Sequence, residues 1–234
     1  VGDQLLARVS DRLKGLMSEN ELCGRLGGDE FAIVIRDASD MMVIDCGPVG
    51  PDYQPGHAHA DTLSFELAVN GRRIIVDSGV YDYEPGRRRT YARSTRAHNT
   101  LCIDQQDQSE TWGVFRVARR AYPTHGRITG DGEVRATFEG AHDGYARLSG
   151  RLTHSRVIEY VSPGEWTVRD TVNGEGIHTI ESLLHVHPDY RLLLVGRSAE
   201  IRDERGNAIL VIAPTPNVAL TIEPGWYFPE FGLK

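Results

Sequence analysis

The stretch Gly56–Leu67, GHAHADTLSFEL, sets two histidines and an aspartate at alternate positions ahead of an apolar run. In an extended strand successive side chains point to opposite faces, so His57, His59 and Asp61 would share one side. Imidazoles and carboxylates on one face suit either a divalent metal ion or proton transfer. The stretch therefore predicts a β-strand that carries a metal or catalytic site.

The overall composition limits the classes of partner. The chain has 234 residues, 40% of them hydrophobic, which is enough for a sizeable core. Its formal net charge of -7 argues against nucleic acid as the main partner, because that partner needs a basic surface. No apolar run approaches the ~20 residues of a membrane span, and the sequence begins without a signal-peptide pattern. The three cysteines form no CxxC pair and predict no disulfide framework.

From about Met41 onward the sequence consists of short β-rich runs separated by turn signals such as Asn70-Gly71 and Ser162-Pro163-Gly164. This pattern is typical of antiparallel β-sandwiches. We therefore expect residues 41–234 to form a mainly β domain, an antiparallel β-sandwich. The expected strands include MMVID, LSFELAV, RRIIVDSG, TLCID, RVIEYV, WTVRDTV, LLLVG, AEIRD, AILVIA and ALTIE.

Residues 1–40 follow a different pattern. DQLLARVSDRLKGLM has apolar residues at helical spacing, and LCGRLGGDEFAIVIRD predicts strands at 22–26 and 31–36. GRLGGDEFAIV resembles the signature hairpin of GGDEF diguanylate cyclases. That resemblance implies that Asp29 and Glu30 suit Mg²⁺ and that Asp3 lies near guanine. The match covers only a fragment, so we expect a partial domain without cyclase activity whose hairpin lacks a sheet to pack against. A diguanylate cyclase fragment is the remote alternative function.

Two further segments supply metal-binding side chains. RRIIVDSG places Asp77 at the end of an apolar strand, and YARSTRAHNT contains His98. Two imidazoles and a carboxylate suit Zn²⁺ with an open fourth position, which predicts His59, Asp77 and His98 as ligands. His57 would then lie beside the metal and stay free for substrate. The alternative is that these histidines are hydrogen-bonded packing residues.

Several motifs in the same order, GPVGPDYQPGHAHADTLSFEL, IIVDSGVYDYEPG, YARSTRAHNTLCIDQQDQSE and WGVFRVARRA, resemble the C-terminal β-sandwich of heparinase II/III-type polysaccharide lyases. The resemblance runs from about residue 41 to the end of the sequence. It implies that His59, Asp77 and His98 hold a zinc ion that is structural. It also implies an acidic, uronate-containing polysaccharide as partner.

These lyases cleave by β-elimination, which needs a neutralised carboxylate, a base and an acid. By resemblance, His57 and Tyr83 are the catalytic candidates. His57 would neutralise the carboxylate or transfer a proton, whereas Tyr83 is either the catalytic tyrosine or an aromatic residue on the sandwich rim. Arg88, Arg93 and Asn99 are the candidate substrate-binding residues, although such an arginine-rich stretch is also typical of a solvated loop.

Other residues allow two interpretations. Trp112 is either a sugar-stacking residue or a sheet-edge aromatic. His185 and His187 form a second HxH pair without an evident third ligand, and we expect them to face the core or its edge. IIVDSGV fits the apolar-Asp-Ser-Gly pattern of aspartic proteases, but the second aspartate that such a site needs is missing.

The resemblance also indicates missing parts. Lyases of this type carry a helical toroid ahead of the sandwich, and we expect this chain to lack the toroid and to be truncated at its C-terminal end. The chain alone should therefore turn over little substrate. The alternative function is a non-catalytic, zinc-stabilised module that binds polysaccharide or a partner domain. The resemblance implies the cell envelope or periplasm, whereas the GGDEF-like piece and the missing signal peptide allow the cytoplasm.

Overall fold

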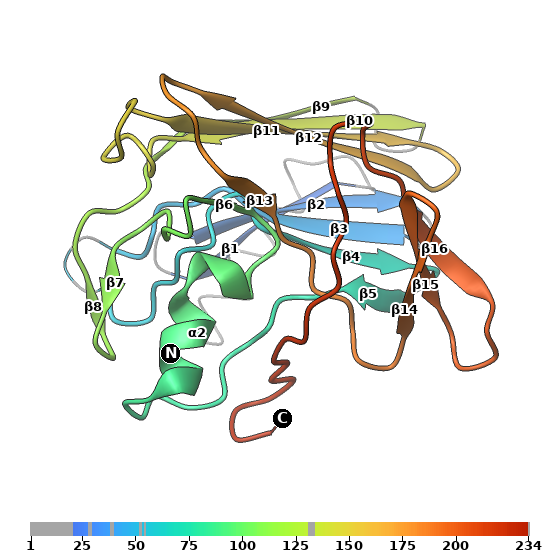
Figure 1. Ribbon diagram of the computed structural model, residues 1–234, viewed down its shortest axis with the longest axis horizontal. Helices are drawn as coiled ribbons and strands as arrows, with labels where there is room; N and C mark the ends of the chain where they lie inside the picture. The colour runs from blue at the N-terminus through green and yellow to red at the C-terminus, as the bar shows by residue number, and fades with distance from the viewer. Residues whose placement is uncertain are drawn as a thin grey trace.

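The computed structural model describes residues 21–27, 30–37, 40–51, 53, 55–130 and 134–233. Two large antiparallel sheets stack face to face, and smaller sheets close the sides (Figure 1). The predicted β-sandwich is therefore confirmed. The predicted N-terminal helix, Asp3 and Asp29 lie outside the described residues.

The first large sheet has five strands. In spatial order they are β1 (Glu21–Gly27), β2 (Glu30–Asp37), β3 (Asp40–Asp45), β4 (Phe65–Val69) and β5 (Arg72–Ile75). The predicted hairpin is confirmed as β1 and β2. It also has a sheet, contrary to expectation, because β2 pairs with β3 from Ala32 opposite Asp45 to Asp37 opposite Asp40. The edge of β3 supplies the backbone hydrogen-bonding partners that the cyclase fragment lacks.

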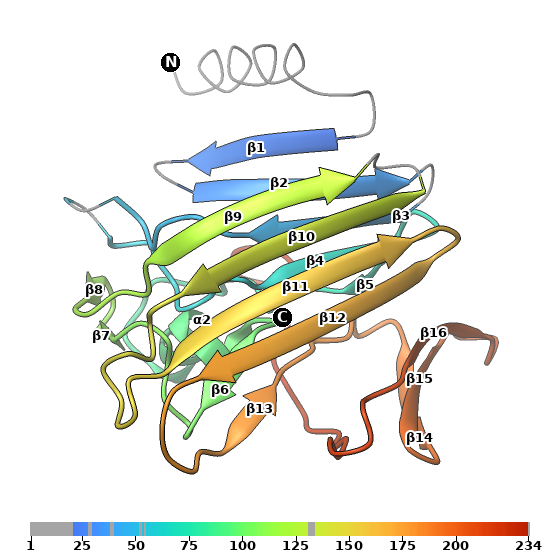
Figure 2. The same cartoon turned by 90° about the horizontal axis from the view of Figure 1, so that it is seen from above.

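The second large sheet has four strands and lies over the first, as the view from above shows (Figure 2). Its order is β12 (Glu165–Asn173), β11 (Thr153–Val161), β10 (Arg135–His142) and β9 (Pro123–Gly130). Along β10 the buried residues alternate with more exposed ones. This period of two is that of a strand with one face on a core.

The core lies between the two large sheets. Met42, Ile44 and Phe65 of the first sheet pack with Phe138 and Ile158 of the second, and all five side chains are buried. Burial of such large apolar side chains contributes roughly 1.5–3 kcal/mol each relative to exposure. This core holds the sandwich together and fixes the loops at its end.

The remaining elements are short. They are α2 (Arg87–Arg93), η1 (Thr95–Ala97), β6 (Leu101–Ile103), β7 (Thr111–Trp112), β8 (Arg116–Val117), β13 (Ile180–Ser182), β14 (Arg191–Val195), β15 (Ser198–Arg202) and β16 (Ala208–Ile212). Strands β14, β15 and β16 form a third sheet, which adds Ile201 to the core. The strand predicted for ALTIE, residues 219–223, is wrong, because this segment forms no strand.

The last described segment crosses back towards the loop after β5. The Phe228 amide donates to the Ser78 carbonyl at 2.7 Å, and the Gly232 amide donates to the Tyr81 carbonyl at 2.7 Å. Gly79 has a φ of 73°, and the carbonyl oxygen of Phe228 lies so close that it would clash with a Cβ at this position. Only glycine therefore fits there. The tail therefore lies against residues 78–83. Among the described residues no helix is long and apolar enough to span a membrane.

Candidate metal centre and active-site face

The GHAHAD segment is a loop that leads into β4, so the strand predicted for it is wrong. The alternation nevertheless persists, because Ala58 and Ala60 are buried while His57, His59 and Asp61 are more exposed. The Ala60 amide donates to the Arg93 carbonyl at 3.1 Å, so the loop is paired with the end of α2 instead of a neighbouring strand.

Three side chains of this region could hold a metal ion. One ligand atom each of His59, Asp61 and His98 lies within 4.8 Å of the other two. Asp77 lies on the Nδ1 side of His98, with its Oδ2 2.5 Å from that nitrogen. The structure thus brings the predicted His98 together with both His59 and Asp77, and it adds Asp61 to the group.

The ring of His98 has one nitrogen left over. Its side chain is buried, and its Nε2 has no hydrogen-bond partner among the described residues. A buried polar atom without a partner costs free energy, unless an ion or water occupies the space beside it. This orphaned atom, together with the mixed imidazole and carboxylate donors, fits a borderline-soft divalent ion such as Zn²⁺.

The electrostatics of the group point the same way. Burial, with a contribution from His98, lowers the pKa of His59 to about 3, so its imidazole is neutral and offers a lone pair. Burial alone would lower the pKa of His98, but the Asp77 carboxylate outweighs it and raises that pKa to about 9. Burial raises the pKa of Asp61. With an ion at Nε2 of His98, Nδ1 would keep its proton towards Asp77, whereas an ion held jointly by Nδ1 and Asp77 would replace that proton.

Arg89 contacts the loop that carries His57 and His59. Its side chain is buried, and it donates hydrogen bonds to the carbonyls of Gly56 and Val114, both at 3.1 Å. Its Nη1 also lies 3.4 Å from Nε2 of His59. This arginine therefore joins the histidine loop to the β7–β8 hairpin.

The two predicted substrate-binding arginines lie in different surroundings. Arg93 is buried and donates to the carbonyls of Ala58, Gly113 and Arg116, each at 3.1 Å. Arg88 is exposed, with its guanidinium carbon 4.1 Å from the ring centroid of Tyr81. Arg88 is therefore placed to meet a ligand from solvent, whereas Arg93 is used within the chain.

Asn99, the third predicted substrate-binding residue, is fully buried. Its Nδ2 donates to the carbonyls of Phe65 at 2.8 Å and Val76 at 2.9 Å, and its Oδ1 accepts from the His185 amide at 2.6 Å. The side-chain amide of Asn99 therefore cross-links three segments around His98. Its role in substrate binding stays a prediction.

The two catalytic candidates lie side by side. The rings of His57 and Tyr83 are edge to face, with centroids 5.1 Å apart and an interplanar angle of 70°. His57 is exposed, and Tyr83 is 39% exposed, so both can meet a ligand. The structure brings this pair together next to the loop that carries His59, and their catalytic role stays a prediction.

Two other side chains of the region were named in the sequence analysis without a role in the site. Each ring nitrogen of His185 lies 3.0 Å from an acceptor oxygen, Nδ1 from Asn99 Oδ1 and Nε2 from the Arg96 carbonyl, and the protonated nitrogen donates. It belongs to the frame around His98, and the HxH pair was the only signal for it. Asp61 was predicted to share one side with His59, although it was not among the three predicted ligands.

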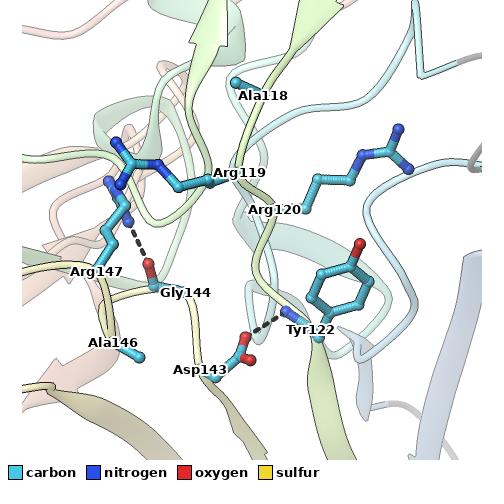
Figure 3. A pocket seen from close by; sticks show the side chains of 8 residues that line it. All are labelled: Ala118, Arg119, Arg120, Tyr122, Asp143, Gly144, Ala146 and Arg147. Carbon is cyan, nitrogen blue, oxygen red and sulfur yellow. Dashed lines mark hydrogen bonds between the residues drawn. The ribbon is translucent and has the colours of Figure 1, made fainter.

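A cavity of about 430 Å³ opens elsewhere and includes none of the predicted site residues in its lining. Figure 3 shows Arg119 and Arg147 on one side and Arg120 with Tyr122 on the other. Arg119 forms a two-pronged ion pair with Glu110, at 2.7 and 2.6 Å, and Arg147 donates to the carbonyls of Asp107, Gln108 and Gly144. These guanidiniums are engaged within the chain, so the cavity is not the candidate site.

The comparisons with known proteins agree with the sandwich and its loops. The family model described as heparinase II/III-like, C-terminal, matches residues 31–234. The chain belongs to this family. A second model, the GGDEF domain of diguanylate cyclases, matches residues 1–48, so the two matches overlap at residues 31–48. The division into segments 1–40 and 41–234 stays a prediction.

Individual relatives point to the same family. A heparin-sulfate lyase from Pedobacter heparinus is 35% identical over 71 residues, which cover 29% of this chain and 10% of that protein. A heparinase III with methylated lysines matches 92% of the chain at a TM-score of 0.68 and 20% identity. The heparan sulfate lyase HepC from Pedobacter heparinus matches 86% at a TM-score of 0.59 and 19% identity. The heparinase II/III-like chain spans only about a third of these solved chains, 32% and 33%.

Proposed function

We propose that the chain is the β-domain of a polysaccharide lyase that cleaves uronate-containing acidic polysaccharides by β-elimination. The family match over residues 31–234 supports the lyase class, and the relatives named heparin-sulfate lyase and heparinase III support an acidic polysaccharide. The observation that carries the proposal is the pairing of His57 with Tyr83, ring centroids 5.1 Å apart, beside the His59 loop.

The reaction assigns a task to each of the two side chains. A base removes the C5 proton of the uronate, a double bond forms between C4 and C5, and the C4–O4 bond breaks as an acid protonates the departing oxygen. The Tyr83 hydroxyl is a proton-transfer group at the surface. The His57 imidazole, its neighbour, neutralises the carboxylate or shares in the proton transfer. No atom beyond the two product chains and the transferred proton is needed.

The proposed zinc ion is held by His59, Asp77 and His98, with Asp61 as a further carboxylate in reach. When bound, the ion supplies a structural cross-link between the loop before β4, the end of β5 and the segment after η1. The partnerless Nε2 of His98 and the close His59–Asp61–His98 group support His59 and His98 as ligands. Asp77 as the third ligand rests on the family resemblance, because Asp77 contacts Nδ1 of His98, the other ring nitrogen. The residues themselves then hold His57 at a fixed place relative to Tyr83.

We also propose that the chain by itself is a weak catalyst. It spans 28–33% of the solved chains that it resembles, and the helical toroid expected for such lyases would supply the rest of the cleft. The family resemblance favours the cell envelope or periplasm as the compartment. The overlapping GGDEF match supports a joined origin for the two parts of the chain.

The experiment combines binding with turnover. The purified chain is titrated with alginate and heparan sulfate oligosaccharides, and the ultraviolet absorbance of unsaturated uronate is followed in the same samples. We expect His57→Ala to weaken oligosaccharide binding about tenfold, because the loss of a hydrogen bond to a charged group has an effect of this size. The exposed His125, which lies on β9, provides the control variant His125→Ala.

The outcomes separate the candidate functions. Slow absorbance growth that Tyr83→Phe abolishes supports the lyase domain. Binding without any growth, unchanged by Tyr83→Phe, favours the non-catalytic polysaccharide-binding module. Absence of binding to every uronate polysaccharide contradicts both, and turnover at the rate of a full-length lyase contradicts the proposed weak activity.

A further inference from the structure

Aromatic rings from three distant segments meet at Tyr83, the neighbour of His57. Phe115 comes from the β7–β8 turn, Tyr83 from the loop before α2, and Phe231 from the last described segment. The centroid of Tyr83 lies 6.0 Å from that of Phe115 and 5.1 Å from that of Phe231, and His57 lies 6.4 Å from Phe115. We refer to Tyr83, Phe115 and Phe231 as the aromatic platform.

The platform is open to solvent. Tyr83 is 39%, Phe115 50% and Phe231 61% exposed, and none of the three belongs to a buried core cluster. Contiguous exposed apolar groups of this kind mark binding surfaces more often than single exposed residues do. The rings of Phe115 and Phe231 are each tilted by 54° to the ring of Tyr83, so neither covers its face as a stacked ring would.

A buried arginine contacts two of the three platform rings. Arg89 is buried, its guanidinium carbon lies 4.9 Å from the Tyr83 ring centroid and 5.8 Å from that of Phe115, and it donates to the Val114 carbonyl. Phe115 also lies against Gly56, where an added Cβ would stand 3.7 Å from its ring. The platform is thus anchored to the loop that carries His57.

The chemistry of the platform favours a sugar ring as occupant. A pyranose presents a face of C–H groups that packs on aromatic faces, and its polar rim stays hydrated. The guanidinium carbon of Arg88 lies 4.1 Å from the ring centroid of Tyr81, and the acidic residues Asp82 and Glu84 flank Tyr83 in sequence. Trp112 on the same hairpin as Phe115 has the guanidinium carbon of Arg116 4.5 Å from its ring centroid and contacts none of the three platform rings among the described ring pairs.

We propose that Phe115 and Phe231 form a stacking subsite for the pyranose unit next to the one held by His57 and Tyr83. This inference rests on the proposed lyase function, because it takes the polysaccharide as the ligand. Stacking on a C–H face does not need the carboxylate of the sugar. The subsite should therefore bind the carboxyl-reduced, neutral form of the same oligosaccharide as well.

The experiment measures dissociation constants by nuclear magnetic resonance titration of the full chain with an alginate oligosaccharide and its carboxyl-reduced form. We expect Phe115→Ala to weaken the binding of both forms about two- to tenfold, the range for the loss of one aromatic contact. Phe115→Tyr should restore binding. His57→Ala should weaken only the acidic form. Tyr122→Ala is the matched control, because Tyr122 is 53% exposed and lies outside the platform.

The outcomes distinguish the subsite from the proposed function. Acidic binding that depends on His57 but is unchanged in Phe115→Ala and Phe231→Ala overturns the subsite alone. Binding of both forms that depends on Phe115, without weaker binding of the acidic form in His57→Ala and without elimination of the acidic form, keeps the subsite and contradicts the lyase function. Equal losses in Phe115→Ala and Tyr122→Ala, or no binding of either sugar, overturn the subsite.

Discussion

The guanidinium of Arg156 lies 2.7 Å from the carbonyl oxygen of Asn99, the residue that follows His98. The same group donates to the Leu63 carbonyl at 2.6 Å, just beyond Asp61, and forms a two-pronged pair with Asp170 at 2.7 and 2.9 Å. One fully buried arginine of β11 thus ties the second sheet to two of the three segments that carry the candidate metal ligands.

Removal of this arginine should destabilise the fold strongly. In Arg156→Ala the Asp170 carboxylate loses its charge partner, and two buried carbonyls lose a donor. Breaking a buried pair in this way costs about 3–5 kcal/mol. Urea denaturation followed by circular dichroism measures the change. Arg169→Ala on β12 is the control, because the side chain of Arg169 is 61% exposed and its 3.6 Å pair with Glu159 should contribute less than about 1 kcal/mol. Equal losses in the two variants would contradict the role of Arg156.

Stability should fall as the pH drops from about 7 to 5. His142 and His154 are buried in contact, Nε2 to Nδ1 at 3.0 Å, with Asp170, Arg156 and Arg147 around them. Burial, with His154 and Arg156 nearby, lowers the pKa of His142 well below its usual value. Below about pH 6.5 the unfolded chain therefore takes up protons that the folded chain does not.

The measurement is the free energy of unfolding against pH for wild type and His142→Asn. Each such histidine contributes a slope of up to about 1.4 kcal/mol per pH unit below pH 6.5, and the variant should lose one such contribution. His125→Asn, an exposed histidine, should keep the wild-type slope. An unchanged slope in His142→Asn would contradict a neutral buried histidine at this position.

Substitutions of the two predicted substrate-binding arginines should have different effects on stability and on binding. Arg88→Gln should change the free energy of unfolding by no more than about 0.5 kcal/mol, because the side chain is exposed. It should weaken the binding of acidic oligosaccharides, and this loss should be smaller at high salt than at low salt. Arg93→Gln should lower stability, because three backbone carbonyls lose their donor. Thermal unfolding and a binding titration at two salt concentrations separate the effects. A binding loss without destabilisation in Arg93→Gln would assign that residue to the ligand instead.

Two carboxylates compete for the third metal position, and their amide variants should rank them. Asp77→Asn should weaken zinc binding most if it is a ligand, as proposed. If the carboxylate only orients His98, its replacement by an amide should lower the zinc affinity roughly 10–100-fold, the effect of losing an outer-shell partner. Competition with a chromogenic chelator gives the affinities of Asp77→Asn and Asp61→Asn. A larger loss in Asp61→Asn would replace Asp77 by Asp61 in the ligand set.

The strands that the sequence predicts correctly are those with branched apolar residues in alternation. β11 and β12 follow RVIEYV and WTVRDTV, and the Asn70-Gly71 turn has positive φ at both positions, 51° and 73°. β10 was missed because its buried face is built from Ala136, Phe138 and Gly140, so little apolar signal remains.

The arginine-rich helix was missed for a related reason. In α2 the buried residues are Arg89, Ala92 and Arg93, and the arginines are buried by donating to backbone carbonyls of distant loops. Apolar periodicity cannot report such a helix. The pairing of His59 with His98 could be predicted from motif order, whereas the approach of Phe231 depends on the path of the tail, which no local pattern encodes.

The most direct test of the account is elemental analysis of the purified chain beside His59→Ala. The account predicts about one zinc ion per wild-type chain and a large loss in the variant, with the sandwich retained by circular dichroism, as the loss of one of three ligands implies. A folded wild-type chain that binds no zinc when zinc is supplied, or a variant with undiminished zinc, would contradict the proposed centre.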